Sequence, residues 1–270
     1  GDVVLEGLAP DEVAIVGAPG GAAELKAEEP VVVRSAAPGD CSVTLRSAPF
    51  EIEVAAGGRV LQHLNARHLL NFEQYRARGA PPHPGLVDAT DVTPDDAALW
   101  SEAFGEHRDS KPRGPAAVGI DVTMKHSEVV VGLAEHATSL DLAAPNFSEP
   151  YRLYNLDVFE YDVDVPMALY GNVPMVTAVH RWPEGGESAS GFLIVNPSEG
   201  FVKVDPSKTA AENTVGDMLT WWLFESGVLD MFVFVGPTPE QVLQQYHTVT
   251  GWPRLPPMAS LGKHQSRWNY

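Results

Sequence analysis

The chain has 270 residues and is short of cysteine, of positive charge and of long apolar runs. Its single cysteine, Cys41, cannot form an intrachain disulfide, so the sequence contains no disulfide framework. Its 18 basic and 36 acidic side chains give a formal charge of −18, which repels phosphate backbones and argues against nucleic acid as a partner. No apolar run approaches the roughly 18 residues of a membrane span. We therefore expect no nucleic-acid binding and no membrane insertion.

Signatures of metal and cofactor chemistry are also missing. The nine histidines show no His-x-x-x-His or Glu-x-x-His arrangement, which leaves metal binding without support. The sequence contains no Gly-x-Ser-x-Gly turn, phosphate-binding loop or dinucleotide fingerprint, which argues against hydrolase-elbow, ATPase and dehydrogenase functions. We therefore expect no metal and no cofactor.

Turn-forming residues are plentiful. The 24 glycines and 23 prolines favour many short strands joined by turns over a helical bundle, so the expected fold class is mostly β. Polar and apolar residues alternate along 42–46 and 50–54, which is typical of a sheet with one face in water. Further strand signals lie at 13–16, 31–33, 118–122, 129–131, 175–179, 191–195, 201–204 and 229–235. Together they predict a β-sandwich.

Two segments depart from this strand pattern. Residues 76–113 are rich in proline and aspartate and are interpreted as a long acidic insertion at the surface, with a short amphipathic piece around 97–104. Farther along, Thr238 as N-cap, proline at the first helical position and Gln241 at the third predict a helix that ends at Gly251. The residues expected on its packing face are Val242, Leu243, Tyr246 and Val249.

Residues 149–162 and 167–174 hold the densest mixture of aromatic rings, carboxylates and amides. A pyranose offers C–H faces for stacking and hydroxyls for hydrogen bonds, so this mixture favours a carbohydrate-contact loop. The alternative is that the rings fill the core while the acids face water. Asp157 and Glu160 are not interpreted as a glycosidase carboxylate pair, because spacing along a loop does not give the roughly 5–5.5 Å separation of a retaining mechanism.

Several segments occur in the order in which glycoside hydrolase family 31 has them, and the chain resembles that family from about residue 42 onward. The matching segments are 109–112, 132–137, 149–159, 166–174, 225–232 and 261–270. Within the family, the resemblance is to the α-glucosidases that trim N-linked glycans in the endoplasmic reticulum. It implies an N-terminal galactose-mutarotase-like β-sandwich that runs into the first strand of a (β/α)₈ barrel, with the rest of the barrel absent from this sequence.

By this resemblance, residues 1–236 form the sandwich domain, 237–257 form a helix and a proline-rich connector, and 258–270 form the first barrel strand. The last residues begin like a strand without a following turn, so we expect the natural protein to continue. The resemblance implies a retaining exo-α-glucosidase whose catalytic aspartates lie on later barrel strands. No catalytic residue is therefore expected in this chain.

The resemblance implies substrate-binding roles for Asp157, Phe159 and Trp268. Asp157 and Phe159 match a loop that reaches from the sandwich toward the sugar on the leaving-group side, where Asp157 would hydrogen-bond hydroxyls and Phe159 would stack. Trp268 matches an aromatic residue on the first barrel strand that lines the pocket of the terminal glucose. Separately, Asn146 begins an Asn-Phe-Ser sequence and is a candidate glycosylation site.

The implied partners are a glucosylated N-glycan, the remainder of the catalytic subunit and a non-catalytic regulatory β subunit, in the lumen of the endoplasmic reticulum. By the same resemblance, a local cysteine pair is expected near Cys41, and the segment 212–220 is shorter than is usual among these α-glucosidases. The redox state of Cys41 therefore stays open. Two alternatives also stay open. The chain could be a non-catalytic carbohydrate-binding sandwich, or part of a family 31 α-glucosidase with another linkage specificity.

Overall fold

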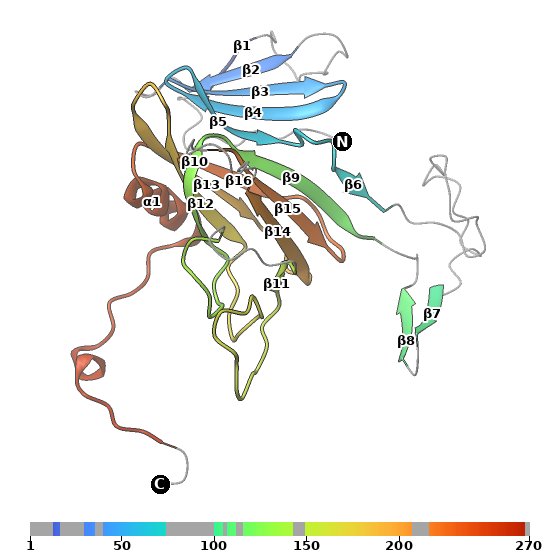
Figure 1. Ribbon diagram of the computed structural model, residues 1–270, viewed down its shortest axis with the longest axis vertical. Coiled ribbons are helices and arrows are strands. Elements are labelled where there is room, and N and C mark those ends of the chain that lie inside the picture. Colours follow the sequence, from blue (N-terminus) through green and yellow to red (C-terminus); the bar gives the residue numbers. More distant parts are fainter. Residues whose placement is uncertain are drawn as a thin grey trace.

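A computed structural model describes residues 13–16, 30–35, 40–73, 100–104, 107–111, 116–142, 149–206 and 216–267. In these residues two antiparallel sheets face each other, and helix α1 (Pro239–Thr250) covers the outer side of the smaller sheet (Figure 1). The predicted mostly-β sandwich is confirmed.

The larger sheet has the strand order β1-β2-β3-β4-β5-β9-β15-β14-β11, and β6 also pairs with β9. Strands β1 to β5 form a meander in which sequence neighbours pair, whereas β9, β15, β14 and β11 face the smaller sheet. The strands are β1 (Val13–Val16), β2 (Val31–Ser35), β3 (Cys41–Ser47), β4 (Phe50–Ala56), β5 (Arg59–Leu64), β6 (Asn71–Phe72), β9 (Val118–Met124), β11 (Tyr151–Leu153), β14 (Gly200–Pro206) and β15 (Met218–Phe224).

The smaller sheet has the order β10-β12-β13-β16. Its strands are β10 (Ser127–Gly132), β12 (Met175–Arg181), β13 (Glu187–Ile194) and β16 (Met231–Gly236). A separate hairpin consists of β7 (Trp100–Phe104) and β8 (His107–Lys111). This hairpin differs from the amphipathic piece predicted around 97–104, and the proline-rich and aspartate-rich remainder of 76–113 lies outside the described residues.

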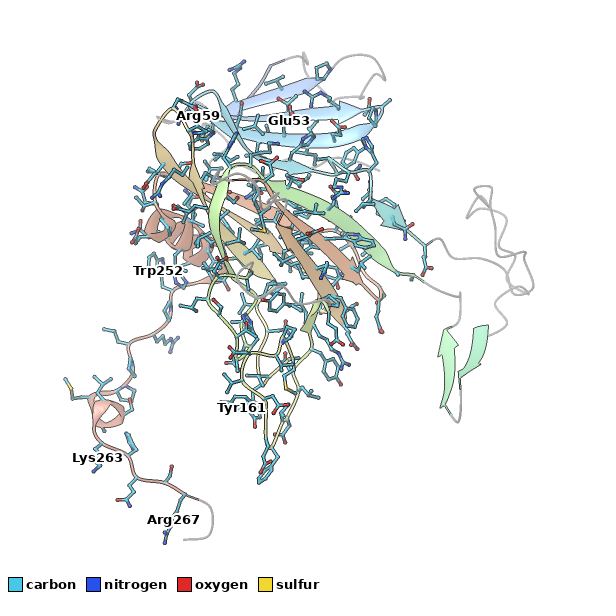
Figure 2. The ribbon with its side chains drawn as sticks, viewed as in Figure 1. Glu53, Arg59, Tyr161, Trp252, Lys263 and Arg267 are labelled. Carbon is cyan, nitrogen blue, oxygen red and sulfur yellow. The ribbon has the colours of Figure 1, made fainter. Side chains whose placement is uncertain are left out.

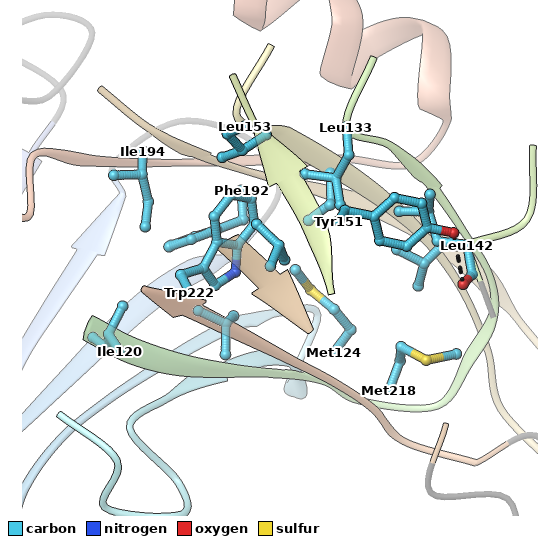
Figure 3. Packing of buried hydrophobic residues seen from close by; sticks show 14 of the residues in the cluster. Ile120, Met124, Leu133, Leu142, Tyr151, Leu153, Phe192, Ile194, Met218 and Trp222 are labelled. Carbon is cyan, nitrogen blue, oxygen red and sulfur yellow. Dashed lines mark hydrogen bonds between the residues drawn. The ribbon is translucent and has the colours of Figure 1, made fainter. Parts of the chain in front are cut away.

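The core fills the space between the facing sheets (Figure 3). Ile120 and Met124 lie on the same face of β9 and are fully buried there. Trp222 of β15 packs edge-on against Phe192 of β13, with ring centroids 5.4 Å apart. Its indole N–H donates to Thr220 Oγ1 at 2.9 Å, so the one polar atom of this large ring is satisfied. Each fully buried large apolar side chain stabilises the fold by about 1.5–3 kcal/mol.

A cluster of buried polar side chains, formed by Gln62, His180 and Ser190, links the two sheets beside this core. Gln62 of β5 donates from Nε2 to Ser190 Oγ at 2.7 Å and to Gly191 O at 3.1 Å. His180 Nδ1 lies 2.5 Å from the carbonyl oxygen of Lys125, and Nε2 lies 2.8 Å from Ser190 Oγ. A carbonyl only accepts, so Nδ1 carries the proton, and Nε2 of a neutral ring accepts from the Ser190 hydroxyl. Burial lowers the pKa of His180 below its ordinary value, in agreement with a neutral ring.

Helix α1 begins and ends as predicted. The side chain of Thr238 accepts a hydrogen bond from the Gln241 backbone N–H at 3.4 Å, and proline occupies the first turn. Gly251 ends the helix with a φ of 94°, in the region that favours glycine. Gln245 then bonds both backbone groups of Val235 on β16, at 3.0 Å to N and 2.7 Å to O, and so occupies part of that sheet edge.

The packing face of the helix is narrower than predicted. Val242 is fully buried in a cluster with residues of β12, β13 and β16, and Tyr246 packs against the same cluster. Leu243 and Val249, however, are 51% and 41% exposed, so their predicted packing positions are wrong. Leu243 lies about 100° around the helix axis from Val242, which turns it away from the sheet.

Past the helix, the chain leaves the sandwich, and Lys263 and Arg267 lie well away from it (Figure 2). Met258–Leu261 form a 3₁₀ helix and 262–267 have no regular structure, where the sequence predicts the start of a barrel strand. A barrel strand exists only when neighbouring strands bond to it, so the assignment of 258–270 stays a prediction. No helix in the described ranges is long and apolar enough to cross a membrane.

Candidate carbohydrate-contact loop

Residues 154–174 connect β11 to β12 and project past the strand ends as a lobe that carries Tyr161 (Figure 2). The lobe starts from the core, because Tyr151 and Leu153 of β11 are buried. Burial, the largest cause, raises the pKa of Tyr151 above its ordinary value. Between these two residues, Arg152 points outward to Glu199 Oε1 at 2.5 Å. The strand therefore fixes one end of the loop to the sandwich.

Large aromatic side chains face solvent along this loop. Phe159 is 83% exposed, Tyr170 is 55% exposed and Tyr161 is 49% exposed. The prediction that the cluster faces outward for contact, rather than filling the core, is consistent with these positions. Asp157 is exposed two residues before Phe159. A carboxylate and a ring are thus presented together, which suits the hydroxyls and the C–H face of a sugar.

The two arms of the loop are tied to each other. The Leu156 N–H donates to Leu169 O at 2.6 Å, and the Tyr170 hydroxyl donates to Val158 O at 2.6 Å. Asn172 Nδ2 also donates to Asn155 Oδ1. These bonds join the two arms where no regular strand pairing does so. The segment that contains Asp157 and Phe159 lies between the bonded residues.

The returning arm is also tied to residues 133–137, which follow β10. The Glu135 N–H donates to Gly171 O at 2.7 Å, and Glu135 Oε2 accepts from the Gly171 N–H at 3.1 Å. The Val173 N–H donates to Ala134 O at 2.8 Å. Leu133, at the start of this segment, is buried in the core. Glu135 and Tyr170 lie in segments that carry the family resemblance, but their contacts could not be predicted from the sequence, because most of the partner atoms are backbone groups.

The remaining predicted positions are placed as follows. Trp268 and Asn146 lie outside the described residues, so their roles stay predictions. Cys41 begins β3 and is half-buried, and its burial, followed by the neighbouring Asp40 carboxylate, raises the pKa of the thiol. In the part of the chain that the structure describes, no three His, Cys, Asp or Glu side chains are placed to hold a metal ion.

Comparisons with known proteins match residues 13–202 to the glycosyl hydrolase 31 N-terminal galactose mutarotase-like domain. The neutral alpha-glucosidase AB of Mus musculus is 38% identical over an alignment 269 residues long, which covers 87% of this chain and 28% of that protein. The Glc1Man2-bound crystal structure of glucosidase II alpha subunit is 32% identical with a TM-score of 0.68, covering 87% of this chain and 24% of that one.

A further crystal structure, of the ER glucosidase II heterodimeric complex of the catalytic subunit and the binding domain of the regulatory subunit, matches with a TM-score of 0.66. The sequence identity is 32%, and the match covers 87% of this chain and 24% of the chain in that structure. The chain thus spans roughly a quarter of the length of these relatives. The domain match covers most of the chain and agrees with the observed sandwich. The chain belongs to the glycosyl hydrolase 31 N-terminal galactose mutarotase-like domain family.

Proposed function

We propose that this chain is the N-terminal part of a retaining exo-α-glucosidase that trims α-linked glucose from N-linked glycans. In this assignment the sandwich supplies the loop that contacts the sugar on the leaving-group side, while the catalytic aspartates belong to a barrel that follows. Family membership supports the enzyme class, and the sequence similarity to glucosidase II alpha subunits supports the substrate class.

The single observation that carries the proposal is the loop with Asp157 and Phe159. Both side chains are exposed, yet the backbone around them is held by hydrogen bonds from the other arm. A loop fixed in this way loses little conformational entropy when a sugar binds. Asp157 would accept hydrogen bonds from hydroxyls, and Phe159 would stack on a pyranose face.

The chemical step would follow the retaining mechanism. One barrel carboxylate attacks the anomeric carbon while the other protonates the leaving oxygen, and the second then activates water to release glucose. Trp268 would line the pocket of the terminal glucose at the carboxyl end of the first barrel strand. The proposed setting is the lumen of the endoplasmic reticulum with a non-catalytic regulatory subunit, which the similarity to the heterodimeric complex supports.

The test compares two substrates in the full-length enzyme. Alanine replacement of Asp157 or Phe159 should lower kcat/KM about tenfold or more for an α-linked glucose disaccharide, because leaving-side contacts are lost. The same variants should change hydrolysis of an activated aryl α-glucoside less than about threefold, because a good leaving group depends little on those contacts.

Glu160→Ala is the matched control, since Glu160 is an exposed carboxylate of the same loop. It should leave both substrates unchanged. Equal losses on both substrates for Asp157→Ala and Phe159→Ala would count against the assignment, as would a Glu160→Ala variant that behaves like them.

A second candidate, a carbohydrate-binding module, is favoured by the exposed rings alone. The chain without further domains distinguishes the two candidates. Under the enzyme proposal it shows no turnover of a chromogenic α-glucoside and binds disaccharide only weakly. Turnover by this chain would refute the division of roles, and submillimolar binding of disaccharide by it would favour the module.

A further inference from the structure

The outward-facing loop has an internal support that the proposed function does not by itself require. Its central link is the Tyr170 hydroxyl, which donates to the carbonyl oxygen of Val158 at 2.6 Å. Val158 lies between Asp157 and Phe159, so this bond fixes the Val158–Phe159 peptide unit, which lies between the side chains of the two candidate contact residues. The Tyr170 side chain is itself 55% exposed, so its hydroxyl is not needed to fill the core.

The next link holds Tyr170 in place. Gly171 is bonded at both backbone groups by Glu135, whose N–H donates at 2.7 Å and whose carboxylate accepts at 3.1 Å. A methyl group added at Gly171 would meet the Glu135 carboxyl at 3.4 Å, so the two residues are already in close contact. Glu135 follows buried Leu133, whose N–H donates to Met175 O at 2.9 Å. The series of contacts therefore runs from the sandwich core to the exposed loop.

We propose that Tyr170 and Glu135 are positioning residues for substrate selection. Glu135 fixes the backbone of Gly171, and Tyr170 then fixes the carbonyl of Val158. Neither side chain needs to touch the sugar: each acts by holding Asp157 and Phe159 in one arrangement before the glycan arrives. This inference rests on the proposed function, because it assigns the effect to the same leaving-side contacts.

The expected effect is a loss of selectivity without a loss of fold. The net contribution of one hydrogen bond corresponds to a change of roughly fivefold in an equilibrium constant. Tyr170→Phe removes only the hydroxyl, so it should raise KM for the disaccharide about fivefold and leave kcat nearly unchanged. Hydrolysis of the aryl glucoside should change less than about twofold, because that substrate depends little on the leaving-side contacts.

The experiment uses the full-length enzyme with both substrates. Tyr246→Phe provides the matched control, because it also removes one tyrosine hydroxyl, but from a residue of helix α1. The ring of Tyr246 packs against the outer side of the smaller sheet. Glu135→Ala should reproduce the effect of Tyr170→Phe. Glu135→Gln should restore much of the selectivity, because its amide oxygen still accepts from the Gly171 N–H.

A double-mutant comparison separates positioning from general damage. In an enzyme that already carries Asp157→Ala and Phe159→Ala, Tyr170→Phe should add less than about twofold, since the residues through which it acts are gone. The inference is overturned if Tyr170→Phe slows both substrates equally, or if its full effect persists in that background. It is also overturned if Tyr170→Phe has no effect while Asp157→Ala impairs disaccharide hydrolysis, an outcome that leaves the proposed function standing. If Asp157→Ala and Phe159→Ala show no selective loss, the proposed function fails and this inference fails with it.

Discussion

Replacing Asp121 tests how the larger sheet is held where β9 changes partners. Leu64 of β5 pairs with Val122, and Asn71 of β6 pairs with Gly119, so the turn between β5 and β6 faces the middle of β9. Asp121 lies there and is fully buried. Its carboxylate accepts from two backbone N–H groups of that turn, those of Arg67 at 2.9 Å and Leu69 at 3.0 Å.

The magnitude follows from these two bonds. A buried N–H left without an acceptor costs about 1–3 kcal/mol. The turn is partly exposed, so water can reach one of the two amides, and Asp121→Ala should lower the free energy of unfolding by about 2–4 kcal/mol. Asp121→Asn keeps one acceptor oxygen but turns an NH₂ group toward the other amide, so it should cost about 1–3 kcal/mol.

The assay is urea unfolding of the chain at neutral pH, followed by tryptophan fluorescence, to which buried Trp222 contributes. Asp205→Ala is the matched control, because Asp205 is an exposed aspartate on β14 of the same sheet, and it should stay within about 0.5 kcal/mol of the parent. An Asp121→Ala variant within that same range would refute the reasoning. Equal costs for the alanine and asparagine variants would show that the acceptor oxygen kept by asparagine contributes nothing.

Three further predictions concern other parts of the molecule. Burial lowers the pKa of His180 below 6.5, so the unfolded chain binds the extra proton and stability should fall as pH drops through about 6.5, by at most about 1.4 kcal/mol per pH unit. In unfolding series from pH 7 to 5, His180→Gln should lack this component, whereas parallel curves for the two proteins would contradict it. Gly191→Ala should cost about 1–3 kcal/mol in urea unfolding, because its methyl group would lie 2.7 Å from Val242 Cγ1; Gly262→Ala should be neutral, and equal stabilities of the two variants would count against this packing argument. Trp268→Ala in the full-length enzyme should raise KM for disaccharide and aryl glucoside alike, since both carry the terminal glucose, and an effect on the disaccharide alone would place this ring on the leaving side instead.

Local patterns in the sequence predicted most of the strands. Alternation along 42–46 and 50–54 corresponds to β3 and β4, and the apolar runs at 118–122 and 175–179 correspond to β9 and β12. β5 and β15 were missed, and so were the short strands β6 and β11 and the hairpin of β7 and β8. In β15, every residue from Met218 to Phe224 except Thr220 is apolar, and Trp221 on the outer face is half-buried. A run with apolar residues on both faces has no period that separates a strand from a buried helix.

The start of helix α1 was predictable because its capping bonds are local, between Thr238 and Gln241. Which side of the helix packs was only partly predictable. Val242 and Tyr246 touch the sheet and Leu243 does not, and the apolar pattern cannot show how wide a sheet lies beneath the helix. The buried contact between Gln62 and Ser190, 128 residues apart, likewise had no local signal.

Two of the regions that expose large apolar side chains differ in how their backbones are held. Trp252 and Leu255 are 64% and 94% exposed on a segment that has no strand pairing in the described ranges. The loop that carries Phe159 also lacks a regular ladder, but its backbone is bonded across its own arms and to Glu135. Exposed side chains on a hydrogen-bonded backbone can select a ligand by shape, because their arrangement exists before the ligand binds. Exposed side chains on a segment without such bonds offer apolar area but no fixed arrangement. For this reason we propose that the loop, and not Trp252 or Leu255, recognises the sugar on the leaving-group side.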